Sequence, residues 1–170
     1  VNDTLSRAQA EVRRLEGEIA ALRGKRSNIP PDLLVARRRI AGQMNLPELA
    51  LPFAGELIDV REEFTAWSGA IERVLAPLST AMLVRDDMLA RVRQEINGIH
   101  LETRLVIDAV ALHVDPPAAV RDERSVIHRI RVADGSFAAY LNRRLGEEFD
   151  YACVAHPDEL DGVDRGVTIS

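Results

Sequence analysis

Cys153 and His156 have the spacing in this 170-residue chain that comes closest to that of a metal site. Two ligands in a C-x-x-H arrangement can hold one side of a zinc ion, but a closed structural site needs about four ligands. The other three histidines, His100, His113 and His128, show no spacing that completes the set. We therefore interpret Cys153 as a small buried strand residue and expect no metal ion.

Other patterns that could support catalysis are incomplete. A phosphate-binding loop reads GxxxxGK[ST], but around Gly24-Lys25 the first glycine is replaced by Ile19 and the hydroxyl residue by Arg26. A nucleophilic serine on a GxSxG elbow is absent from the sequence. Acidic pairs such as Glu62-Glu63 fall near expected helix starts, where solvation and capping account for them. The sequence predicts no catalytic residue and no cofactor.

Arg37, Arg38 and Arg39 are the candidates for contact with a polyanion. We expect them to fan around the outside of a helix over residues 31–44, where their guanidinium groups could contact DNA phosphates. The alternative is a solvated basic face that neighbouring acids balance, and we favour this alternative. The net charge of −5 also argues against a wholly basic nucleic-acid clamp.

A heptad pattern over residues 3–26 predicts a coiled-coil helix, for which a plain amphipathic helix is the alternative. The apolar seam contains Leu5, Val12, Leu15, Ile19 and Leu22. An isolated helix of this length cannot bury its own stripe, so we expect a partner helix. We assign residues 1–27 to an arm segment and residues 28–170 to a folded domain, which a loop near 113–122 divides into two halves.

Helices and strands alternate along residues 28–170, which predicts a mixed α/β (α+β) architecture. The expected strands lie at 57–60, 80–84, 104–110, 126–132, 151–155 and 166–169; the expected helices begin at Pro31, Phe64, Asp86 or Asp87, Ser136 and Pro157. A single cysteine excludes an internal disulfide. Without a signal peptide or an apolar run of membrane-spanning length, the sequence predicts a cytoplasmic protein.

The stretch LPFAGELIDV and the WSGAIERVL helix after it form the centre of this pattern. Gly55 is expected to permit backbone angles closed to other residues. Helical spacing predicts that Trp67 and Ile71 point into the core, and Gly69 is expected to let a neighbour pack closely beside Trp67.

These two strings resemble the hinge region of MukB-like SMC proteins, the branch that contains MksB and the JetC (EptC) subunit of Wadjet anti-plasmid systems. The resemblance extends from about Ile29 to Thr168. It implies a homodimer that joins two coiled-coil arms to entrap DNA, in plasmid defence or in chromosome organisation near the nucleoid. It further implies kleisin and accessory subunits for the full-length protein, and an ATPase built from chain ends outside this stretch.

Two other functions remain open at this point. The first is a DNA-binding hinge whose basic face adds affinity. The second is a small-molecule-binding α/β domain, which needs a convergent polar pocket that the sequence does not locate.

Overall fold

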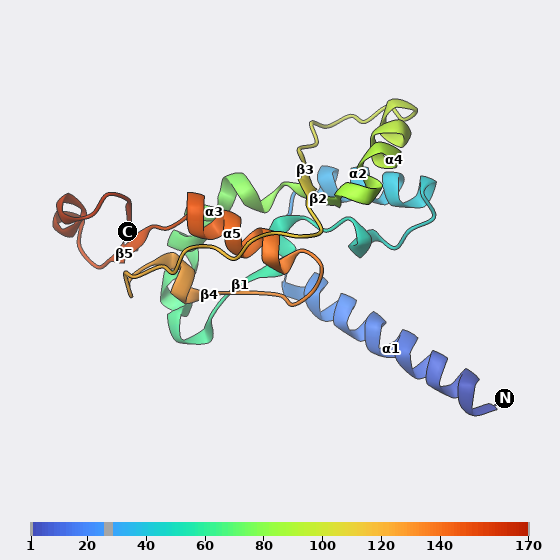
Figure 1. The fold of residues 1–170 in the computed structure, drawn as a ribbon, viewed down its shortest axis with the longest axis horizontal. Helices are drawn as coiled ribbons and strands as arrows, with labels where there is room; N and C mark the ends of the chain where they lie inside the picture. Colours follow the sequence, from blue (N-terminus) through green and yellow to red (C-terminus); the bar gives the residue numbers. More distant parts are fainter. Residues whose placement is uncertain (1, 26–28, 170) are drawn as a thin grey trace.

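The computed structural model describes residues 2–25 and 29–169, with side chains for residues 3–14 and 29–169 (Figure 1). The predicted mixed α/β class is confirmed. With η for 3-10 helices, the elements are α1 (Asn2–Lys25), α2 (Pro31–Gln43), η1 (Glu48–Ala50), η2 (Ala54–Leu57), β1 (Ile58–Val60), η3 (Glu62–Trp67), α3 (Ser68–Ser79), β2 (Met82–Arg85), α4 (Asp86–Asn97), β3 (Ile107–Val110), η4 (Val126–Arg129), β4 (Ile130–Val132), α5 (Ala138–Glu148), β5 (Ala152–Val154), η5 (Pro157–Gly162) and β6 (Gly166–Thr168).

Helix α1 projects away from the remaining elements (Figure 1). Its 24 residues correspond to a length of about 36 Å at 1.5 Å per residue. Two residues of the predicted coiled-coil seam, Leu5 and Val12, are 60% and 53% exposed. The side chains of the other seam residues, Leu15, Ile19 and Leu22, lie outside the described residues. The coiled-coil pairing therefore stays a prediction.

A similar order of elements occurs twice in the folded domain. In the first series, Phe53 forms a bridge to β2, and η2, β1, η3, α3, β2, α4 and β3 follow along the chain. In the second series, Ser125 forms a bridge to β5, and η4, β4, α5, β5, η5 and β6 follow. The change from one series to the other falls within residues 111–124. The division into two halves near 113–122 stays a prediction.

Within residues 29–169, the strands form three two-stranded sheets. Strands β1 and β4 pair antiparallel and join the two series, with Asp59 directly opposite Arg131. Strands β2 and β3 pair in parallel through the crossover helix α4, and β5 and β6 pair in parallel through η5. A parallel pair needs such a crossover, because the chain must return to the starting end of the first strand.

Strand β2 is the wall between two apolar clusters. Met82 and Val84 pack into a cluster with α2 and α4, whereas Leu83 points into a second cluster. This alternation follows from the two-residue period of a strand that is covered on both faces. The second cluster combines residues from both series: Ala54, Ile58, Ile71, Leu75, Leu78, Leu83, Val110, Val126, Ile130, Leu141, Leu145, Phe149 and Cys153.

Several predicted elements begin later than expected, and at two of them the local structure also differs. The strand predicted at 126–132 starts only at Ile130, because Val126–Arg129 forms the 3-10 helix η4. The Ser125 hydroxyl accepts a hydrogen bond from the Ile127 amide at 3.2 Å, a local side-chain bond that favours a turn over a strand. The helix predicted from Phe64 is a 3-10 segment with non-helical angles at Phe64, followed by α3 from Ser68.

Candidate interaction surfaces

Strands β3 and β6 lie at the edges of their sheets. In these two parallel pairs, β2 and β5 are hydrogen-bonded along both of their edges. Strand β2 also bonds to residues 52–54, and β5 also bonds to residues 124–126. Within the described part of the chain, no further strand pairs with the outer side of β3 or β6. The β3 edge presents backbone groups that can pair with another chain. The β6 edge is partly occupied, because Arg73 Nη2 on α3 donates to the Thr168 carbonyl at 3.1 Å.

Apolar side chains are exposed beside both edge strands. Val106 and Leu112, which flank β3, are 47% and 53% exposed, and Ile169, which follows β6, is 48% exposed. Ala109, within β3, is exposed as well. Exposed apolar residues that gather on open strand edges are typical of surfaces that another chain covers.

A groove of about 830 Å³ lies between residues 111–115 and α5. At its base the Asp108 carboxylate pairs with the Arg144 guanidinium, and Tyr140 Oη donates to Asp108 Oδ2 at 3.3 Å. Burial is the main cause that raises the pKa of Tyr140, and the Arg144 guanidinium opposes this shift. This network ties β3 to α5 and so fixes one wall of the groove beside the edge strand.

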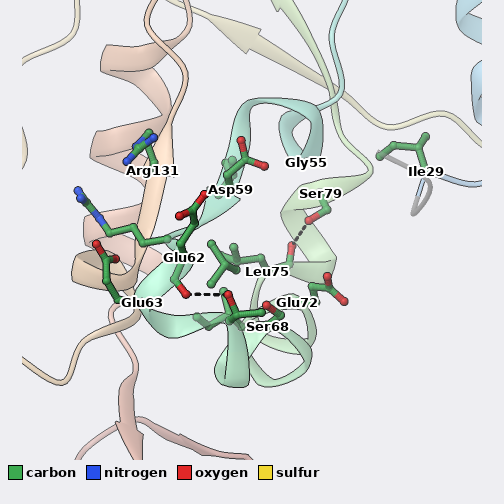
Figure 2. A pocket seen from close by; sticks show the side chains of 15 residues that line it. Ile29, Gly55, Asp59, Glu62, Glu63, Ser68, Glu72, Leu75, Ser79 and Arg131 are labelled. Atoms are coloured by element: carbon green, nitrogen blue, oxygen red, sulfur yellow. Dashed lines mark hydrogen bonds between the residues drawn. The ribbon is translucent and has the colours of Figure 1, made fainter. Parts of the chain in front are cut away.

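A second groove, of about 620 Å³, lies between β1, η3 and α3 (Figure 2). Carboxylates and guanidinium groups both line it, and two of its hydroxyl groups donate to the local backbone. Thr65 Oγ1 donates to the Glu62 carbonyl at 2.7 Å, and Ser79 Oγ donates to the Leu75 carbonyl at 3.0 Å. These bonds stabilise the helices and do not converge on a ligand.

The three candidate DNA-binding arginines lie in different environments. The prediction that Arg37 points outward is wrong, because it is 2% exposed and pairs with the equally buried Glu56. Arg38 is exposed and pairs with Glu48 at 3.2 Å. Arg39 is also exposed, and its Nη1 donates to the His100 carbonyl at 2.8 Å.

The residues of the central motif differ in how deeply they are buried. Ile71 is fully buried, as predicted, whereas Trp67 is half-buried at the edge of the core. The Arg129 guanidinium lies 4.6 Å from the Phe64 ring centroid and 4.8 Å from the Trp67 ring centroid, a cation–π arrangement that the sequence did not reveal. Gly69 is exposed, and an added Cβ would meet Arg73 Nη1 only at 3.8 Å, so the expected close packing at Gly69 is wrong.

Gly55 is required for a reason other than the expected one. Its backbone is not in the positive-φ region, which among the described glycines holds only Gly135. An added Cβ would lie 3.0 Å from both the Cβ and the carbonyl oxygen of Ser79. A side chain at position 55 would therefore push η2 away from the end of α3.

The residues considered for metal chemistry do not converge. Cys153 is buried in β5, where burial raises the pKa of its thiol, and His156 is exposed. Across residues 2–25 and 29–169, no group of three His, Cys, Asp or Glu side chains is placed to hold a metal ion. Helices long and apolar enough to cross a membrane are also missing from these residues.

This arrangement of paired series and small parallel sheets is the fold of an SMC hinge domain. The Smc hinge domain of Pyrococcus furiosus with an extended coiled coil aligns over 99% of this chain and 67% of its own, with 21% identity and a TM-score of 0.54. An asymmetric dimer of the Geobacillus stearothermophilus SMC hinge domain aligns over 99% of this chain and 72% of its own, with 16% identity and a TM-score of 0.53.

A further hinge structure from Pyrococcus furiosus covers 81% of this chain and 80% of its own, with 18% identity and a TM-score of 0.53. No protein-family model matches the sequence. The search of curated proteins gave no match either. The comparisons therefore establish the fold.

Proposed function

We propose that this chain is a non-catalytic dimerisation hinge of an SMC protein, which joins two coiled-coil arms through the contact of two copies. The single observation that carries the proposal is the edge of β3, with which no further strand pairs among the described residues and which the exposed Val106 and Leu112 flank. The SMC hinge fold and the projecting helix α1 support it.

The driving force for association is the burial of these apolar residues together with backbone pairing along the strand edges. A C2 dimer uses each contact twice, so the β3 edges of both copies would be covered. Enclosure of DNA by the arms then depends on closure at the hinge, and ATP hydrolysis belongs to other parts of the protein.

Substitution of Leu112 by lysine tests the role of the β3 edge. A tenfold rise in Kd corresponds to a loss of about 1.4 kcal/mol in binding free energy. Because Leu112→Lys places a charge at the dimer contact, we expect its Kd to rise by at least about tenfold. Val35 is the matched control, since it is 54% exposed but lies on α2, and Val35→Lys should leave the dimer intact. Equal Kd values for the two variants would remove the β3 edge from the proposal.

A DNA contact on the α2–α4 face is the second candidate function. Arg39 and Arg91 both donate to backbone carbonyls, of His100 at 2.8 Å and of Met44 at 3.4 Å, and a carbonyl acceptor does not neutralise the positive charge of a guanidinium group. Charge reversal of Arg38 and Arg39 should weaken DNA retention and reduce its salt dependence. Arg124→Glu is the control, and equal retention by all variants would exclude this face.

The motif LPFAGELIDV further supports placement in the MukB-like branch, with JetC (EptC) and MksB. On this proposal the full-length protein is cytoplasmic and nucleoid-associated, and it assembles with kleisin and accessory subunits in plasmid defence or chromosome organisation. Co-purification of the full-length protein with the products of neighbouring genes tests this placement. Recovery of no such subunit would contradict it.

A further inference from the structure

The charged pair Arg37–Glu56 is buried and makes several directed contacts. The two side chains are 3% and 2% exposed, and Arg37 Nη2 donates to Glu56 Oε2 at 3.2 Å beside the shorter bond from Nη1 to Oε1. The Phe53 amide donates to Glu56 Oε1 at 2.9 Å. The Arg37 guanidinium also lies 5.0 Å from the Phe53 ring centroid. The pair thus joins α2 firmly to the start of η2.

The elements α2 and η2 hold α1 in position. Helix α1 contacts η2 directly, and the chain continues from α1 to Ile29, which is 4% exposed, and then into α2. Behind η2, the close approach of Gly55 to Ser79 leaves no room for movement toward α3. Ile29, Gly55 and Ser79 surround the same groove in Figure 2. A change in the spacing of α2 and η2 would therefore tilt α1.

A buried ion pair is a costly way to obtain stability, because desolvation offsets most of the attraction, and an apolar pair of the same volume serves as well. Its advantage is geometry, since the two parallel bonds of a guanidinium–carboxylate pair fix both a distance and an angle. We propose that Arg37 and Glu56 are positioning residues that set the direction in which the arm leaves the hinge. The inference rests on the proposed function only in treating α1 as an arm.

The test measures the distance between α1 and the domain by double electron–electron resonance. Spin labels are placed on Ala10→Cys and Gln94→Cys, since both positions are exposed on helices. Cys153 is buried and the pKa of its thiol is raised, so it reacts slowly with the label. Ala10 lies about 22 Å from the end of α1, so a tilt of about 10° moves the label by about 4 Å.

The variant Arg37→Met with Glu56→Gln removes both charges but keeps an acceptor for the Phe53 amide, so no lone charge is buried. We expect its distance distribution to broaden or shift by about 4 Å, the lever-arm displacement of a helix at 1.5 Å per residue, while cooperative unfolding is retained. Arg38→Met, which breaks an exposed pair on the same helix, should leave the distribution unchanged. A folded double variant with the wild-type distribution would overturn the inference.

A conservative substitution of Arg37 adds a readout that a stabilising role alone would not change. Arg37→Lys keeps the charge but loses the two-pronged geometry, so we expect an arm direction as variable as in the double variant. A wild-type distribution in Arg37→Lys would contradict the role of geometry. Dilution with unlabelled chains restricts the signal to one chain, so the result does not depend on dimerisation. A light-scattering mass of the same samples tests the proposed function separately.

Discussion

Substitution of Gly55 by alanine tests the close contact between η2 and α3. The new Cβ would lie 3.0 Å from Ser79 Cβ, 3.0 Å from the Ser79 carbonyl oxygen and 3.3 Å from Ser79 Cα. None of these atoms is the end of a flexible side chain, so relief requires a backbone shift in η2 or α3. Overpacking of this kind costs about 1–3 kcal/mol.

The expected loss in melting temperature follows from chain length. A domain of this size loses about 2–4 °C per kcal/mol, so Gly55→Ala should lower Tm by about 2–12 °C in a calorimetric or circular-dichroism melt. Gly42→Ala is the matched control, because an added Cβ at position 42 of α2 meets nothing within 4 Å. Replacement of glycine by alanine inside a helix stabilises a protein by about 0.5–1 kcal/mol. Gly42→Ala should therefore raise Tm, whereas Gly55→Ala should lower it. A Gly55→Ala variant as stable as the wild type would refute the reasoning.

Three further predictions concern charged and titrating side chains. Arg37→Met leaves Glu56 buried without its partner and should lower the free energy of unfolding, measured by chemical denaturation, by about 3–5 kcal/mol. Arg38→Met, at an exposed pair, should change it by less than about 0.5 kcal/mol. Equal losses in the two variants would contradict the claim that burial makes the Arg37 pair more important. Arg129→Met should shift the fluorescence emission of Trp67 and lower the free energy of unfolding by about 0.5–2 kcal/mol. Arg131→Met, on the exposed side of β4, should leave the emission unchanged. An unshifted spectrum in Arg129→Met would exclude the ring contact. Because burial raises the pKa of Cys153, the unfolded thiol loses its proton at lower pH than the folded one, so the free energy of unfolding should fall as pH rises above about 8.5. Cys153→Ala should reduce this fall. The same pH dependence in Cys153→Ala and the wild type would mean that other groups cause it.

Helical spacing accounts for the buried face of α2, but the expectation for Arg37 followed its charge and was wrong. Leu33, Ala36, Ile40 and Met44 are buried as the 3.6-residue period requires. Arg37 follows Leu33 by four residues and precedes Ile40 by three, so the same period places it on the inner face. Its charge favoured an outward orientation only because the buried acid that pairs with it, Glu56, is 19 residues away in sequence.

Long-range contacts of this kind account for most of what the sequence could not predict. The bridge from Ser125 to β5, the Arg129 contact with Phe64 and Trp67, and the Asp108–Arg144 pair each join elements that only the fold brings together. The sequence also did not reveal the open edge of β3, because strand spacing identifies strands but not their neighbours. The apolar residues that flank this edge, Val106 and Leu112, read in sequence as ordinary core positions.

The solution mass of the chain, measured by light scattering across a concentration series, tests the dimerisation hinge most directly. We predict twice the mass of one chain, retained on dilution and reduced toward one chain mass by Leu112→Lys but not by Val35→Lys. A single-chain mass at every concentration would contradict the account.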